Sequence, residues 1–258
     1  MDSGQVIQEV LRSDIVDDPS RSPALEPSRA IVTARRRREW GKQASLAAVT
    51  LGAIGGFIAI TRTIEGSGGN AFDRAVVHAF GRGRHPITNV LVRGVTFFGS
   101  AAAGIAISTS AIIIARRRPR IALQVVTGAL GGTVAELIIK RFFRRERPTI
   151  LAHLERVTST SFPSGHSMAA ASIYLSLAFV GSRSRRLRRH RAATIAGASA
   201  LAASIGATRV FLGVHWPTDV LAGLSLGTAW ACATEAMFDL TAASQLEQTP
   251  NLTRPSQT

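Results

Sequence analysis

Cysteine is nearly absent from this sequence. It occurs once, as Cys232 within an apolar segment, so the chain holds no partner for an intrachain disulfide. No cluster of cysteine or histidine has the spacing of metal ligands, and we therefore expect neither a metal site nor another cofactor. The first 30 residues also lack the apolar core of a cleaved signal peptide, so we expect the first apolar span to act as the insertion signal.

Acidic residues are scarce as well. The chain has 16 Asp and Glu against 31 Lys and Arg, which gives a net charge of +15. A soluble protein this basic would be expected to bind nucleic acid, because clustered arginines neutralise phosphates. Here short arginine runs alternate with long uncharged apolar segments. This alternation is typical of a polytopic membrane protein, so we expect membrane lipids as partners and no nucleic acid. The sequence indicates no oligomeric state.

Apolar segments predict an all-α polytopic membrane protein with six transmembrane helices. At about 1.5 Å per residue, the short first segment covers most of a hydrocarbon core of about 30 Å. The fourth segment is shorter, and we expect its helix to begin near Ser164. The expected spans are Ala44–Ile60, Val95–Ala115, Ile121–Ile139, Ser167–Val180, Ala192–Ala207 and Val220–Phe238.

The regions outside the spans are polar. We expect a flexible tail over residues 1–34, a six-span domain over residues 35–239 and a polar tail over residues 240–258. The first tail is rich in Pro, Ser and Asp and has too little apolar surface to offset the entropy of ordering.

A shorter amphipathic helix is expected between the first two spans. Asn70 can cap it, and Asp73 and Arg74 lie opposite its apolar positions. We expect this helix to lie in the membrane interface. Its apolar positions are Phe72, Val76, Val77 and Phe80.

Three clusters of polar residues lie at the ends of the later spans. Their order and spacing resemble the signature motifs of the type 2 phosphatidic acid phosphatases, which share an active site with the vanadium haloperoxidases and glucose-6-phosphatase. Thr208 departs from the family, which usually has Ser there. The clusters read K-x6-R-P from Lys140 to Pro148, P-S-G-H from Pro163 to His166, and (S/T)-R-x5-H-x3-D from Thr208 to Asp219.

The cations of these clusters suit a phosphate group. Cleaving a phosphate ester requires positive charge around the three equatorial oxygens of the transferring group, and Lys140, Arg147 and Arg209 can supply it without a metal. Ser164 is expected at the start of a helix, where the Gly165 N–H and the helix dipole favour an anion. These five residues are the expected phosphate-binding set.

Two histidines and an aspartate are the expected catalytic residues. Pro217 fits the first turn of a helix, and this places Asp219 where it can face back toward His215 and fix its tautomer. The resemblance implies that His215 attacks phosphorus to form a phosphohistidine, and that Asp219 orients it. It also implies that His166 protonates the leaving oxygen and later activates water.

Other charged residues near the motifs have simpler interpretations. We expect Arg141, Arg144 and Arg145 to be solvated or to contact lipid headgroups, with a role in substrate binding as the alternative. Glu136 is either a functional intramembrane charge or the partner of Lys140 in an i,i+4 ion pair.

Orientation follows from the basic residues between spans. The positive-inside rule places on the cytoplasmic side the segment before the first span and the links after the second and fourth. Both termini are then cytoplasmic, and the three motifs face the extracytoplasmic side of what we expect to be a bacterial inner membrane. The basic residues are Arg35 to Arg38, Lys42, Arg116 to Arg118, Arg120 and the six arginines between 183 and 191.

The expected function is therefore a metal-independent lipid phosphate or diphosphate phosphatase. The family suggests undecaprenyl diphosphate, phosphatidate-type lipids or the phosphates of lipid A as substrates. Vanadate-dependent halide oxidation is an alternative, but those enzymes are larger and soluble. A non-catalytic phospholipid-binding or transport protein that retains the pocket is another, against which the presence of His166, His215 and Asp219 argues.

Overall fold

The computed structural model describes residues 29–64 and 68–248. Most of the predicted N-terminal tail lies outside these residues, and its last part belongs to a helix. The chain divides into two compact units, Met1–Lys42 and Gln43–Thr258. The described part of the first unit is helical, and the second unit contains all three motifs.

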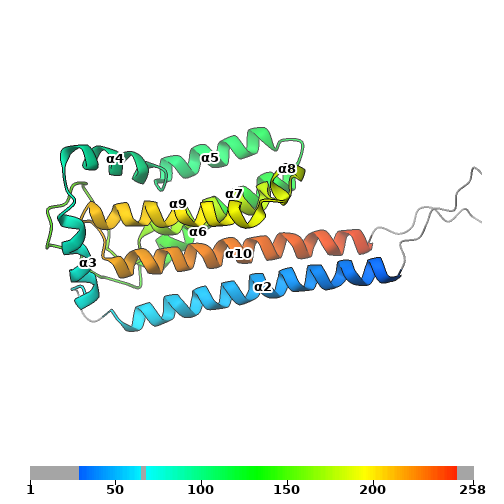
Figure 1. The fold of residues 1–258 in the computed structure, drawn as a ribbon, viewed down its shortest axis with the longest axis horizontal. Helices are drawn as coiled ribbons and strands as arrows, with labels where there is room; N and C mark the ends of the chain where they lie inside the picture. The colour runs from blue at the N-terminus through cyan, green and yellow to red at the C-terminus, as the bar shows by residue number, and fades with distance from the viewer. Residues whose placement is uncertain (1–28, 65–67, 249–258) are drawn as a thin grey trace, which may run out of the picture. The chain divides into compact units, whose positions relative to one another are not determined.

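The described residues form helices and no strand, in agreement with the all-α prediction. Helix α10 extends past residue 239, where a polar tail was predicted to begin. In chain order the helices are α2 (Arg29–Arg62), α3 (Ala71–Gly81), α4 (Pro86–Phe97), α5 (Ala101–Ile114), α6 (Pro119–Lys140), α7 (Gly165–Gly181), α8 (Arg185–Arg188), α9 (Arg191–Phe211) and α10 (Pro217–Gln248) (Figure 1).

The predicted second span is interrupted. Helix α4 ends at Phe97, and Ser100 caps α5 by accepting a hydrogen bond from the Ala103 N–H at 3.2 Å. The two helix axes differ by 43°. The intervening Gly99 packs so closely that a Cβ atom there would lie 2.5 Å from Ile205. The prediction of the second span did not include this break, because hydropathy does not register such a contact.

Fewer candidate spans appear than the six predicted. By length and composition, the described residues contain four: Arg36–Arg62, Pro119–Lys140, Arg191–Phe211 and Pro217–Ala242. The bent pair of α4 and α5 makes a possible fifth. Helix α7, which holds the predicted fourth span, is apolar but has 17 residues, so six spans stay a prediction.

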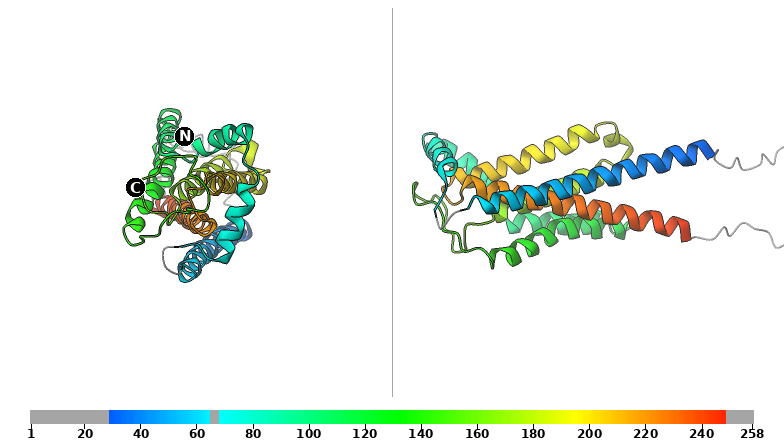
Figure 2. Two further views of the ribbon diagram at one scale, coloured as in Figure 1. Left: turned by 90° about the vertical axis from the view of Figure 1, so that its left-hand side faces the viewer. Right: turned by 90° about the horizontal axis from the view of Figure 1, so that it is seen from below.

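Helix α7 is the packing centre of the second unit. It contacts α6, α9 and α10, and these helices run side by side (Figure 1, Figure 2). Small residues allow the close approach: a Cβ atom on Gly223 of α10 would lie 2.5 Å from the Ser164 carbonyl oxygen. The start of α7 is therefore held directly against α10.

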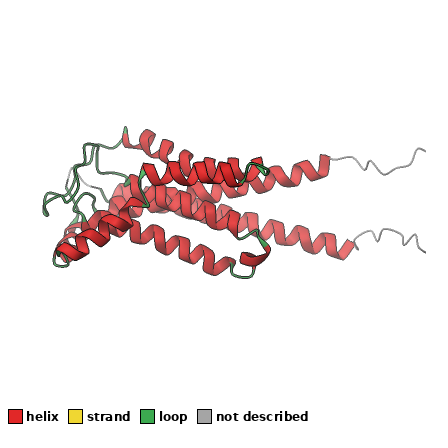
Figure 3. Cartoon of the chain, turned by 90° about the horizontal axis from the view of Figure 1, so that it is seen from above, coloured by secondary structure: helices red, strands yellow, loops and turns green. Residues whose placement is uncertain are grey.

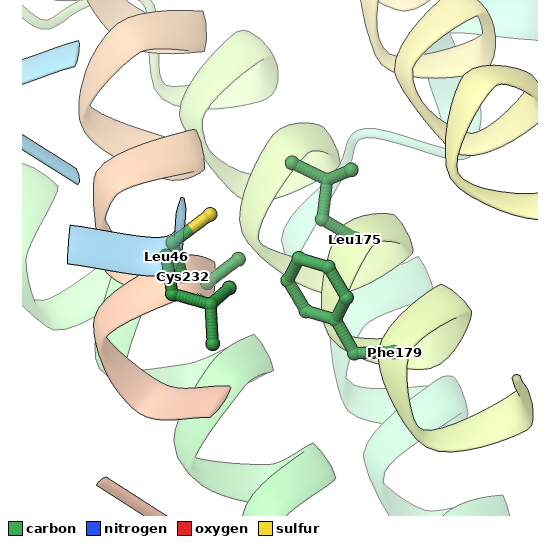
Figure 4. Close-up of a cluster of buried hydrophobic side chains, with 5 residues drawn as sticks. Leu46, Leu175, Phe179 and Cys232 are labelled. Carbon is green, nitrogen blue, oxygen red and sulfur yellow. The ribbon is translucent and has the colours of Figure 1, made fainter. Parts of the chain in front are cut away.

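An apolar cluster joins α7 and α10 away from the motifs. Leu175 and Phe179 of α7 pack there with Cys232 of α10 and with Leu46 (Figure 4). Cys232 is buried and has a free thiol. It behaves as a small apolar residue of the core.

The predicted amphipathic helix is α3, but its register differs from the prediction. Asp73 and Val77 are buried, whereas Phe72 is 53% exposed. The placement of Asp73 opposite the packing face was therefore wrong. Its carboxylate is stabilised by two interactions that helical periodicity cannot reveal: the capping box with Asn70 and an ion pair with the buried Arg145.

Candidate active site

The three motifs meet at one end of the second unit, where its longest loops gather (Figure 3). Lys140 is the last residue of α6, and Arg147 lies in the loop that joins α6 to α7. Arg209 lies in the last turn of α9, close to the link between α9 and α10. Gly165 and His166 open α7, His215 lies in that link, and Asp219 lies in the first turn of α10.

The His215 imidazole lies between a carboxylate and a guanidinium. Its Nδ1 is 3.5 Å from Asp219 Oδ2, and its Nε2 is 3.3 Å from Arg147 Nη1. Because a guanidinium only donates hydrogen bonds, Nε2 must accept and the proton of the neutral ring lies on Nδ1. The lone pair on Nε2 therefore points away from Asp219. This Nδ1 contact is long, and catalytic hydrogen bonds often tighten only in the complex with substrate.

Burial controls the charge of this ring. The pKa of His215 is lowered to about 4, mainly by desolvation and also by Arg147 and Arg209, while Asp219 opposes the shift. The imidazole is therefore neutral at pH 7. A neutral ring is the form that can act as a nucleophile.

Asp219 is fixed by donors other than His215. Its Oδ2 accepts hydrogen bonds from the Ser161 hydroxyl and, at 2.9 Å, from the Trp216 N–H. Its Oδ1 accepts from Arg145 Nη1 at 2.6 Å. Its carbonyl oxygen accepts from the Ser164 N–H at 3.0 Å, which ties the start of α10 to that of α7.

The three predicted phosphate-binding cations all contact protein acceptors. Lys140 Nζ lies 2.6 Å from Glu136 Oε1, and Arg209 Nη1 lies 2.6 Å from Glu155 Oε2. Arg147 donates to the Ser159 carbonyl oxygen at 2.9 Å. Of the two interpretations of Glu136, the structure shows the i,i+4 ion pair.

Glycine at position 165 allows this arrangement. A Cβ atom there would lie 2.6 Å from Glu136 Oε1, so a larger residue would displace the partner of Lys140. Gly165 is the first residue of α7, and its N–H has no acceptor within the helix. Ser164 is the N-cap, but its hydroxyl accepts a hydrogen bond from Ser167 at 2.9 Å rather than from the helix backbone.

His166 lies on the first turn of α7 and is half-buried. Within the part of the chain that the structure describes, its ring nitrogens have no hydrogen-bond partner. The cations Arg209, Lys140 and Arg147 and the His215 ring all lie close enough to act on it electrostatically. The structure therefore brings His166 together with the residues of the other two motifs.

Thr208, the departure from the family pattern, does not face the site through its hydroxyl. The hydroxyl donates to the Ile205 carbonyl oxygen within α9. The neighbouring Arg209 is held by the Thr96 hydroxyl at 2.9 Å as well as by Glu155.

The sequence prediction for Arg145 was wrong. Its side chain is 2% exposed and forms ion pairs of 2.6 Å with both Asp73 and Asp219. Arg144 beside it is exposed, as predicted. Trp216, which was not assigned to the site, is also buried and donates to the Glu146 carbonyl oxygen at 3.0 Å.

Several other site residues were missed. Asp73, Thr96, Glu155 and Ser161 lie outside the three motifs, so spacing gave no signal for them. The one available signal was Asp73 itself, the acidic residue in the first turn of a helix whose other residues are mainly apolar. Within residues 29–64 and 68–248, no group of three or more His, Cys, Asp or Glu is placed to hold a metal ion.

Several known proteins are similar to this chain in sequence. The PAP2 superfamily matches residues 120–241. The chain is 30% identical over 176 residues to phosphatidylglycerophosphatase B of Bacillus subtilis, covering 66% of this chain and 85% of that protein. It is 31% identical over 140 residues to the decaprenylphosphoryl-5-phosphoribose phosphatase of Mycobacterium tuberculosis, covering 52% of this chain and 72% of the relative.

A solved structure has the same fold. The crystal structure of a transmembrane PAP2 type phosphatidylglycerolphosphate phosphatase from Bacillus subtilis superimposes with a TM-score of 0.64 at 26% identity, covering 78% of this chain and 98% of the other. Together with the apolar helices, these relatives identify an integral membrane protein and a phosphate ester hydrolase. The chain belongs to the PAP2 superfamily.

Proposed function

We propose that this protein is a metal-independent lipid phosphate phosphatase that works through a phosphohistidine on His215. The observation that carries the proposal is the state of the His215 ring. Its Nδ1 faces Asp219, and its Nε2 lone pair faces the cation Arg147. A phosphate bound by Arg147 would lie next to the attacking nitrogen.

The cations account for the first step. Lys140, Arg147 and Arg209 would exchange their protein acceptors for the phosphate oxygens and stabilise the charge of the transition state. His215 Nε2 then forms a bond to phosphorus while the bond from phosphorus to the lipid oxygen breaks. The negative charge of Asp219 stabilises the imidazolium that results.

His166 accounts for the proton that the leaving group needs. A bound phosphate dianion would favour the imidazolium form of His166 despite the cations around it. His166 gives its proton to the departing lipid oxygen, and the neutral ring then takes a proton from water. The water oxygen attacks phosphorus, the bond to Nε2 breaks, and inorganic phosphate is released.

The membrane setting supports a lipid substrate. Lys140 and Arg209 lie at the ends of candidate spans, in α6 and α9. We place this end of the protein on the extracytoplasmic side of a bacterial inner membrane, because arginine-rich links such as α8 favour the cytoplasm. The relatives are named for phosphatidylglycerophosphate and decaprenylphosphoryl-5-phosphoribose, so phosphatidate-type lipids and undecaprenyl diphosphate are the substrates we propose.

Phosphate release by the detergent-purified protein tests the proposed function. The substrates are phosphatidate, phosphatidylglycerophosphate, undecaprenyl diphosphate and a lipid A phosphate, each with excess EDTA. We expect at least one lipid to release phosphate in the presence of EDTA, and we expect this release to require His215. Binding without release from any of them would favour the non-catalytic alternative, and release abolished by EDTA would contradict the metal-independent mechanism.

Replacing His166 tests its role as the acid. His166→Ala is expected to slow the first turnover of phosphatidate by about 10²- to 10⁴-fold, because an alkoxide leaves poorly without a proton. p-Nitrophenyl phosphate has a good leaving group, so its first turnover should slow far less and give a burst of p-nitrophenol. Rapid-mixing kinetics compare the two, and equal losses would contradict the acid role.

Replacing Glu155 tests whether its carboxylate competes with the substrate phosphate for Arg209. The Glu155 carboxylate is 39% exposed and pairs with Nη1 of Arg209, which is 2% exposed, so a phosphate that binds this amino group would displace the carboxylate. Glu155→Gln is therefore expected to lower the inhibition constant of inorganic phosphate by about tenfold. The reason is that phosphate no longer has to replace a charge-assisted hydrogen bond between Glu155 and Arg209. Glu146→Gln is the control, because Glu146 is exposed. An unchanged constant in Glu155→Gln would contradict the competition.

A further inference from the structure

A buried chain of charges lies behind the candidate nucleophile. Arg145 Nη2 is 2.6 Å from Asp73 Oδ2, and Arg145 Nη1 is 2.6 Å from Asp219 Oδ1. Arg145 is 2% exposed and the two carboxylates are 0% exposed. Asp73 comes from α3, Arg145 from the loop between α6 and α7, and Asp219 from α10, so the contact joins three separate elements.

We propose that Arg145, held by Asp73, is a positioning residue that directs the Asp219 carboxylate toward His215. This inference rests on the proposed function, since it assigns a role in the reaction of His215. Asp73 is in turn the residue that holds Arg145 in place. Neither residue belongs to the three motifs' expected catalytic or phosphate-binding set.

Geometry is the first argument. The guanidinium is planar and its two amino groups have a fixed relative direction. One amino group is held by Asp73 and the other by Asp219 and, at 2.7 Å, by the Thr218 hydroxyl. With Asp219 Oδ1 held by Arg145, the carboxylate cannot rotate freely, and Oδ2 stays directed at His215 Nδ1.

The supports of Asp73 fix the other end of the chain. Asp73 Oδ1 accepts a hydrogen bond from the Thr218 N–H at 2.9 Å. The capping box with Asn70 holds the same carboxylate to the first turn of α3. The Arg145 guanidinium lies over the Trp216 ring, with its Cζ atom 5.7 Å from the ring centre. These contacts leave Arg145 a single well-defined position.

Charge is the second argument. Arg145 alone would cancel the charge of Asp219 and leave His215 without a counter-charge when its ring becomes cationic. Asp73 adds a second carboxylate, so the trio carries one net negative charge. That charge can stabilise the imidazolium of the phosphohistidine, because His215 is 2% exposed and little solvent screens the interaction.

The test compares Arg145→Lys, Arg145→Gln and Asp73→Asn with Arg144→Gln, an arginine of the same loop that is exposed. The assay measures kcat and KM for phosphate release from short-chain phosphatidate in detergent, with thermal unfolding of each protein. For Arg145→Lys and Arg145→Gln we expect kcat to fall about 100-fold or more, with KM changed less than about threefold, because the loss is of orientation and not of phosphate contacts. Arg144→Gln should match the wild type.

The pH profile separates positioning from mere folding. The charged and titratable groups that face His215 are Asp219, Arg147, Arg209 and His166. Removing the positive charge of Arg145 favours the imidazolium, so the acid limb of kcat/KM should move to higher pH in Arg145→Gln. Removing the negative charge of Asp73 should move it to lower pH in Asp73→Asn. Shifts of opposite sign support the inference.

Other outcomes overturn it. Wild-type kcat and pH profiles in the folded variants, with an active wild type, would overturn the inference and leave the proposed function standing. Loss of folding in all three variants, or lower activity with an unmoved acid limb, would show a structural role instead. No phosphate release by wild type or by Arg144→Gln would overturn the proposed function itself, and the inference with it.

Discussion

Replacing His215 by alanine is expected to reduce kcat by on the order of 10⁴-fold or more. The change removes the proposed nucleophile, and the cations that bind phosphate cannot replace it. The polar contacts of the ring are few and long, 3.3 Å to Arg147 and 3.5 Å to Asp219 and to Ser161, so the fold should survive. Steady-state phosphate release and thermal unfolding in detergent measure both effects.

The matched control is another histidine of the same unit. His78 on α3 is exposed, and His78→Ala should keep wild-type kcat. Substrate binding should also persist in His215→Ala, because Lys140 and Arg209 remain. Wild-type rates in His215→Ala would remove the basis for a phosphohistidine.

Replacing Asp219 by asparagine is expected to lower kcat by up to about 10⁴-fold, the cost of losing the orienting carboxylate in a comparable triad. An amide nitrogen facing His215 Nδ1 would favour the tautomer with its proton on Nε2, which has no lone pair for attack. The same change leaves Arg145 with one carboxylate, Asp73, in place of two. Rapid-quench kinetics of the first turnover measure the effect.

An exposed carboxylate near the motifs is the control for Asp219. Glu146→Gln removes one negative charge from the loop that holds Arg145 and Arg147, and its kcat should stay within about twofold of wild type. A similar loss in both variants would show that general electrostatics, and not the orientation of His215, explains the role of Asp219.

The motif residues were predictable because their chemistry follows from local spacing. His215 and Asp219 are four positions apart, and Pro217 between them begins a helix, so the sequence alone places one facing the other. Lys140 and Gly165 were likewise recognisable at the ends of apolar segments. The structure brings all of these together at one end of the helices.

Arg145 was not predictable, because neighbouring basic residues look alike in a sequence. Arg144 and Arg145 differ in burial since Arg145 meets Asp73, a residue far away in the chain. The break between α4 and α5 was missed for a related reason. Gly99 lies in an apolar run, and its tight contact with Ile205 of α9 is a property of packing and not of hydropathy.

The central claim is a covalent bond between phosphorus and His215, and trapping it is the most direct test. Wild-type protein and His166→Ala would be mixed with ³²P-labelled p-nitrophenyl phosphate, whose good leaving group departs without the acid, then quenched in alkali, and the labelled peptide would be identified. We expect label on the peptide that carries His215, more of it in His166→Ala because water is no longer activated, and none in His215→Ala. Label on another residue, or turnover by wild type without labelled protein, would contradict the mechanism.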